Sequence, residues 1–185
     1  MPFARRPATL AAGLAGAALI ATGLGFAAAE HAGARAERAG VQDTIDALYD
    51  VISGPAGEAR DWDRMRSLFH DDAIMSVVPP EGSRRALPLR LNVEDYIERS
   101  GPILERDGFF ELEIASEVEI YGTLAHSFST YAAKRTEDGE VFMRGINSIQ
   151  LGRDLSDTER PWKVISIAWC QETPRTPIPA EYDAD

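Results

Sequence analysis

The sequence predicts an α+β fold in which a strongly curved antiparallel sheet is closed by N-terminal helices around a pocket. Two observations predict it. Apolar residues recur at helical spacing between Val41 and Arg106, and at a period of two between Phe110 and Gln171. Helices followed by a long antiparallel meander are the order of an α+β domain. A curved sheet covered by helices leaves a cavity, and cavities of this kind are where small ligands bind.

The first 29 residues have the pattern of an export signal. Arg5 and Arg6 precede an almost unbroken run of Ala, Gly, Leu and Ile that ends in three alanines, Ala27 to Ala29. We expect cleavage near Ala29, no stable membrane insertion afterwards, and a periplasmic or secreted bacterial protein. A retained anchor is the alternative, because about 20 apolar residues can span a bilayer. The choice between the general and the twin-arginine export route is left open.

Composition sets the number of domains and excludes one class of partner. With 185 residues, 44% of them hydrophobic, the chain is long enough for one domain with a core. We place that domain at residues 41–173, after a spacer at 30–40 and before a proline-rich tail at 174–185. The net charge of −11 repels phosphate backbones, so we expect no nucleic-acid partner. We expect neither a metal nor a cofactor.

Three helices are predicted before the meander. The first has one apolar stripe from Val41 to Ile52, and the second is short and begins after Asp61 as N-cap. We expect the second to end at Asp71 and Asp72, before a strand at 73–78. Asn92, with Asp95 three residues later, opens the third. Ser100-Gly101-Pro102 interrupts this helix, and its continuation after a kink is the alternative.

The meander begins with a clear period of two. Apolar residues from Phe110 to Ile120 alternate with four glutamates, which predicts a half-exposed strand with the glutamates on the solvent side. The next strand, residues 123–135, has mixed residues on both faces, so its inward face stays open. The last strand, Trp162 to Gln171, is apolar on both faces and suits the middle of a sheet.

One polar residue is out of place in the strand between them. Asn147 falls on the same face as Val141, Met143, Ile149 and Leu151. Burying an amide without a hydrogen-bond partner costs about 1–3 kcal/mol. Asn147 therefore marks either a ligand-binding position in the pocket or a core amide that links strands.

Other candidate site residues each carry a structural alternative. Tyr49 is an oxyanion donor or a core aromatic, and His126 is a general base only if it faces inward. Asp71 and Asp72 are acid–base groups or solvated charges. Three aromatic residues wall the pocket or belong to the ordinary core: Trp62, Phe69 and Trp169.

The order of elements resembles the nuclear transport factor 2-like (NTF2-like) superfamily, in its SnoaL-like and ketosteroid-isomerase-like branches. The residues that carry the resemblance are Asp61-Trp62-Asp63, Leu68 to Ala73, and the final strand beginning Trp162-Lys163-Val164. The resemblance covers about Val41 to Gln171. It implies a cone-shaped α+β domain with a pocket, often dimeric through the outer face of the sheet, so a homodimer is an implied partner.

The resemblance transfers few catalytic residues. In ketosteroid isomerases a tyrosine on the first helix and an acid on a late strand hold the enolate oxygen, and Tyr49 and Asn147 fall near those positions. The base position holds Val77, or Ser76 after a slip of one residue. Neither can take a proton from carbon. Scytalone dehydratases are similar at Asn147 and at Asp61-Trp62-Asp63-Arg64, but their other catalytic residues have no counterparts here.

The sequence therefore predicts an exported protein that binds a small, largely apolar molecule. Two alternatives remain: a lyase or isomerase with an unorthodox base, and a non-catalytic dimerisation or interaction domain. A base within reach of the cavity would favour the enzyme, a cavity without one would favour binding, and a filled core would favour the interaction domain.

Overall fold

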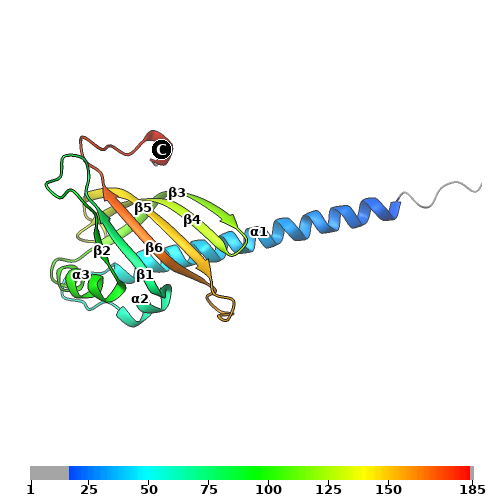
Figure 1. Cartoon of the computed structure of the whole chain (residues 1–185), viewed down its shortest axis with the longest axis horizontal. Helices are drawn as coiled ribbons and strands as arrows, with labels where there is room; N and C mark the ends of the chain where they lie inside the picture. Colours follow the sequence, from blue (N-terminus) through cyan, green and yellow to red (C-terminus); the bar gives the residue numbers. More distant parts are fainter. Residues whose placement is uncertain (1–16, 184–185) are drawn as a thin grey trace, which may run out of the picture. The chain divides into compact units, whose positions relative to one another are not determined.

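The computed structural model describes residues 17–183, with side chains from residue 31 (Figure 1). It contains the helices α1 (Ala17–Ile52), α2 (Trp62–Leu68) and α3 (Val93–Asp107) and a short 3₁₀ helix, η1 (Ala180–Tyr182). The six strands are β1 (Phe69–Val78), β2 (Leu89–Leu91), β3 (Phe110–Tyr121), β4 (Leu124–Lys134), β5 (Val141–Arg153) and β6 (Trp162–Gln171). The first 16 residues of the predicted export signal lie outside the described residues. Among the described helices, none combines the length and apolar character needed to cross a membrane.

The strands form one curved, open sheet in the order β2-β1-β6-β5-β4-β3. Neighbours pair antiparallel except β1 and β6, which run parallel, with Val77 opposite Trp169. The expectation of an antiparallel sheet is therefore wrong for this pair. The reason is that β6 takes its direction from its hairpin with β5, whereas β1 enters from α2, so no hairpin sets its direction. The strand β6, the last in the chain, lies between β1 and β5, which confirms the prediction that the last strand is near the middle of the sheet.

The helices α2 and α3 and the C-terminal part of α1 supply buried side chains that pack on one face of the sheet, and together they enclose the core. Val41, Ile45, Met65, Ile149 and Val164 are fully buried there. The apolar stripe predicted from Val41 to Ile52 is thus the face of α1 that packs inward.

Some elements differ from the prediction at their ends. The helix α1 continues through residues 30–40, so it begins before Val41, and the segment predicted as a partly helical spacer is helical throughout. The strand β1 begins at Phe69, so Asp71 and Asp72 lie in a strand and do not end the helix in a turn. The capping box of Asn92 and Asp95 is confirmed, and α3 continues through Pro102. The strand β2 was missed because three residues are too few to show a period.

The C-terminal tail packs on the outer face of the sheet, opposite the helices (Figure 1). Thr130 Oγ1 donates a hydrogen bond of 2.5 Å to the carbonyl of Tyr182, whose ring meets that of Phe128 edge-on at 4.9 Å. Arg144 forms ion pairs with Glu172 and Asp183. The tail therefore occupies part of the face through which the resemblance implied a dimer, and the dimer stays a prediction.

A buried arginine joins the ends of α1 and α3. The Arg60 side chain is only 7% exposed. It donates to the carbonyl oxygens of Ile52 at 3.0 Å, Gly54 at 2.6 Å, Glu58 at 2.5 Å and Leu104 at 3.2 Å. The carbonyl of Ile52, the last residue of α1, lacks an intrahelical partner and lies at the negative end of the helix, so a guanidinium satisfies both its hydrogen bond and the helix dipole. The carbonyls of Gly54 and Leu104 also accept backbone N–H groups, from Phe109 and Gly108.

We expect Arg60→Met to lower the free energy of unfolding by about 3 kcal/mol or more, because buried carbonyls then lose a charged donor. Chemical denaturation of the full-length chain measures the change. Arg64→Met is the matched control, since Arg64 makes one exposed ion pair with Asp50, and such pairs contribute about 0–1 kcal/mol. Equal effects of the two substitutions would contradict the role given to Arg60.

Candidate functional site

The first part of β3 turns its glutamates inward. Gly54 and Phe109 exchange backbone hydrogen bonds of 2.7 and 3.0 Å, and the Glu111 N–H donates to Ser53 Oγ at 3.0 Å. This attachment to the end of α1 sets the register, so Glu111 and Leu112 point the opposite way from the prediction. Leu112 is 49% exposed.

A β-bulge then restores the expected pattern further along β3. In a regular strand Glu113 and Val118, five residues apart, would lie on opposite faces. The pairing with β4 shifts between Glu113 and Ala115, so both face inward. The prediction that all four glutamates lie on the solvent side is therefore wrong for Glu111 and Glu113. The glutamates Glu117 and Glu119 are exposed as predicted.

Between the helices and the sheet lies a cavity of about 230 Å³. Its wall is mostly apolar, with polar groups from few side chains. The helices contribute Leu48, Tyr49, Ile52, Met65, Tyr96, Ser100, Ile103 and Leu104. The strands, with Phe109 just before β3, contribute Phe109, Glu111, Met75, Tyr131, Met143, Asn147, Ile167 and Trp169. An apolar pocket with a few convergent polar groups is the usual form of a small-molecule site.

Glu111 is the one carboxylic acid among the residues that line this cavity. The residue as a whole is half-buried, and protein surrounds its carboxyl on nearly all sides. Burial raises the pKa of Glu111 to about 7, and the hydrogen bond from Asn147 partly opposes the shift. At neutral pH the carboxyl is therefore divided between its charged and neutral forms.

Asn147 is buried at the same end of the cavity and is hydrogen-bonded. Its Nδ2 donates to Tyr49 Oη at 2.9 Å and to Glu111 Oε1 at 3.3 Å. Tyr49 Oη lies 2.6 Å from Ser129 Oγ, which donates to Glu113 Oε1 at 2.5 Å. These four side chains and Glu111 form a continuous polar chain along one wall.

Two further phenol groups line the cavity. The hydroxyl of Tyr131 and that of Tyr96 make no hydrogen bond to any residue that the structure describes. Burial and then the charge of Glu111 raise the pKa of both, so the phenols stay protonated and can donate. Tyr131 lies against Gly145, where a Cβ would come within 2.6 Å of the Tyr131 hydroxyl, so only glycine fits there.

The predicted site residues divide into two groups. Tyr49, Asn147 and Trp169 line the cavity, while Trp62 packs against Gly101 in α3 and Phe69 lies in the core at the start of β1.

None of the three weak catalytic candidates reaches the cavity. His126 is on the outer face of the sheet, where its Nε2 lies 3.2 Å from Ser148 Oγ. Asp71 and Asp72 are exposed on β1.

Sequence reasoning missed Glu111, because glutamates at a period of two look the same whichever face they occupy. The sequence carries one signal, the break in the alternation at Ala115-Ser116, where an alanine stands on the face of the glutamates and a serine on the face of the apolar residues. Among the described residues no cluster of His, Cys, Asp and Glu could hold a metal ion.

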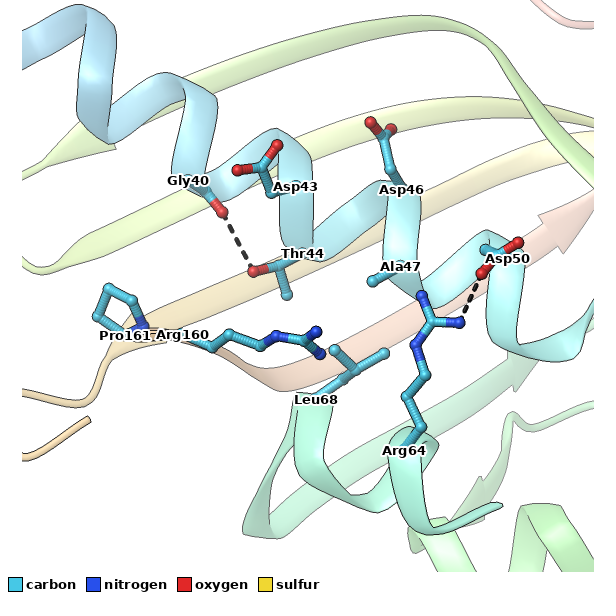
Figure 2. Close-up of a pocket in the computed structure, with 10 residues that line it drawn as sticks. All are labelled: Gly40, Asp43, Thr44, Asp46, Ala47, Asp50, Arg64, Leu68, Arg160 and Pro161. Atoms are coloured by element: carbon cyan, nitrogen blue, oxygen red, sulfur yellow. Dashed lines mark hydrogen bonds and ion pairs between the residues drawn. The ribbon is translucent and has the colours of Figure 1, made fainter. Parts of the chain in front are cut away.

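A larger hollow of about 460 Å³ lies elsewhere, between α1, α2 and the loop before β6 (Figure 2). Arg64 and Arg160 reach into it, and Arg64 is ion-paired with Asp50 at 2.5 Å. Its charged side chains are solvated. Thr44 is buried, and its hydroxyl is already hydrogen-bonded to the carbonyl oxygens of Gly40 at 3.1 Å and Trp162 at 3.3 Å. We therefore place the candidate site in the smaller, apolar cavity.

Comparisons with known proteins support the fold. No family model and no curated protein sequence matches. Among solved structures, a nuclear transport factor 2-like protein of unknown function from Shewanella baltica is 14% identical, with 74% of this chain and 94% of that chain covered and a TM-score of 0.50.

Two similar structures come from Novosphingobium species. A hexachlorocyclohexane dehydrochlorinase from Novosphingobium barchaimii is 14% identical, over 75% and 88% of the two chains, with a TM-score of 0.53. The beta subunit of a putative aromatic-ring-hydroxylating dioxygenase from Novosphingobium aromaticivorans is 19% identical, over 78% and 99%, with a TM-score of 0.52. The chain thus has the nuclear transport factor 2-like fold.

The pKa of Glu111 predicts how stability depends on pH. Between its pKa near 4.5 in the unfolded state and its pKa of about 7 in the folded state, the Glu111 carboxyl is protonated in the folded protein and ionised in the unfolded chain. Stability therefore falls as pH rises from about 4.5 to about 7, by roughly 3 kcal/mol in total. We expect Glu111→Gln to remove this loss, so that the variant is more stable than the wild type at about pH 8 and similar at about pH 4.

Chemical denaturation at the two pH values measures the difference. Glu117→Gln is the matched control, because Glu117 lies on the same strand but is exposed. An equal pH dependence in the wild type and Glu111→Gln would show that the Glu111 carboxyl is not buried as described.

Proposed function

We propose that this protein is an enzyme that binds a small, largely apolar molecule in the cavity and transfers a proton on it, as a lyase or isomerase does. Glu111 is the general base. The observation that carries the proposal is a single carboxyl, with a pKa of about 7, in the wall of an otherwise apolar cavity. A general base works best when its pKa lies near the operating pH, because it is then both ionised and strongly basic.

The base comes from a different strand than the resemblance suggests. Val77, at the isomerase base position, is on β1 and pairs with Trp169 on β6, whereas Glu111 is on β3 at the far side of the sheet. The fold is shared with a hexachlorocyclohexane dehydrochlorinase, and removal of hydrogen chloride requires a base. That likeness supports a proton-transfer reaction in a cavity of this fold and says nothing of the substrate.

Binding without turnover is the simpler function and the first that the sequence suggested. Tyr49, Asn147 and Trp169 would then serve as ligand contacts only, and Glu111 as a polar anchor. The presence of a cavity argues against the third class, an interaction domain with a filled core. We further propose, from the sequence of residues 1–29 alone, that the protein is exported to the periplasm or secreted.

A generic carbon acid tests the proposed base without knowledge of the natural substrate. The probe 5-nitrobenzisoxazole is small, apolar and aromatic. A carboxylate removes the proton from its ring carbon, the C–H electrons form a nitrile, and the N–O bond breaks to release a coloured phenolate. The proton ends on the carboxylate and returns to water.

We expect the full-length protein to accelerate this reaction with a rate that rises through about pH 7, because only ionised Glu111 accepts a proton. Glu111→Gln should lower the rate by about 100-fold or more, the usual contribution of a general base. Glu117→Gln, which changes an exposed glutamate on the same strand, should not. A rate that is the same in Glu111→Gln as in the wild type would overturn the assignment.

A further inference from the structure

We propose that the polar chain behind the cavity holds Asn147 as a hydrogen-bond acceptor, so that the bound molecule is a small apolar alcohol whose hydroxyl donates to Asn147 Oδ1. This inference rests on the proposed function only in requiring that a small molecule occupies the cavity. It names the chemical class of that molecule, and it does not require that Glu111 catalyses a reaction.

The direction of the chain is set by Glu113. The Glu113 carboxyl oxygens accept hydrogen bonds from Gln42 Nε2 at 2.6 Å and from Ser129 Oγ at 2.5 Å. Ser129 has one hydroxyl proton, which this bond uses. Tyr49, 2.6 Å away from Ser129 Oγ, must therefore donate its own proton to Ser129. The oxygen of Tyr49 is left as an acceptor.

The orientation of the Asn147 amide follows. One N–H of Nδ2 donates to the Tyr49 oxygen at 2.9 Å and the other to Glu111 Oε1 at 3.3 Å. A flipped amide would place its oxygen against the Tyr49 oxygen, which has no proton to give, and against Glu111, whose ionised form is also an acceptor only. A buried polar group without a partner costs about 1–3 kcal/mol. The amide nitrogen is thus held against the wall.

The amide oxygen faces the cavity. Asn147 Oδ1 accepts no hydrogen bond from any residue that the structure describes. Among those residues the one fully enclosed side-chain polar atom without a partner is Ser127 Oγ. Oδ1 is therefore accessible, and the space beside Asn147 is the cavity.

This polarity favours an alcohol over a ketone of the same shape. An alcohol can donate to Asn147 Oδ1 and also accept from the free hydroxyl of Tyr131 or Tyr96. A ketone can accept from either phenol but leaves Oδ1 without a donor, and a site built around a substrate hydroxyl rejects the analogue that lacks it. The cavity, about 230 Å³, suits a molecule of one or two small rings.

The test is a comparison of indan-1-ol with indan-1-one, which differ only at the oxygen-bearing carbon. Isothermal titration of the full-length protein should show the alcohol binding at least about 10-fold more tightly, the effect of one satisfied hydrogen bond. A ketone that binds as tightly as the alcohol would overturn the proposal, and so would the absence of binding by both.

Ser129→Ala tests the chain itself. Without the Ser129 oxygen, the Tyr49 proton can turn to Asn147, the amide can flip, and Nδ2 can donate into the cavity. We expect the preference for the alcohol to fall to about equal affinity or to reverse. Ser127→Ala is the matched control, because Ser127 is the neighbouring inward serine on β4 and lies outside the chain. An unchanged preference in Ser129→Ala would overturn the proposal.

These outcomes are separate from those of the proposed function. A preference for the alcohol together with an inactive base in the nitrobenzisoxazole assay would support this inference and reject the enzyme. Activity in that assay together with a preference for the ketone would support the enzyme and reject this inference.

Discussion

The site depends on the way Arg60 holds the ends of two helices together. Its buried guanidinium donates hydrogen bonds to carbonyl oxygens at the end of α1 and near the end of α3. A Cβ on Gly54 would come within 2.7 Å of Arg60 Nη1, so the loop can close on the guanidinium only with glycine there. The closed loop presents Gly54 to Phe109, and this pairing starts β3 in the register that turns Glu111 inward.

The inward glutamate has a cost that the fold has to offset. A carboxylate in an apolar cavity loses the solvation that water would provide, and the rise in its pKa is the measure of that loss. Buried carboxyl groups of this kind are typical of functional sites, because selection for stability alone would favour an apolar side chain or glutamine at the same position. Burial and the nearby charge of Glu111 raise the pKa of the three tyrosines around it, so all three stay protonated.

The same fold can present opposite polarities at one position. In the isomerases that the sequence resembles, the late-strand position and the first-helix tyrosine donate hydrogen bonds to a substrate oxygen. Here Glu113 and Ser129 draw the Tyr49 proton away from the cavity, and Asn147 turns its oxygen towards it. The hydrogen bonds from Glu113 through Ser129 and Tyr49 to Asn147 therefore decide whether the amide accepts or donates a hydrogen bond in the cavity.

The sequence alone determined the fold class, the stripe of α1 and the inward position of Asn147, because periods of 3.6 and two are local properties of the backbone. The capping box at Asn92 was likewise readable, since its hydrogen bonds join residues three apart. The tertiary structure decided which face of β3 is inward. Glu111 and Glu117 share one period-two pattern, and only the attachment to Gly54 and the bulge after Glu113 separate them. The parallel pairing of β1 with β6 and the outward position of His126 were also decided there, because both depend on contacts between residues distant in the chain.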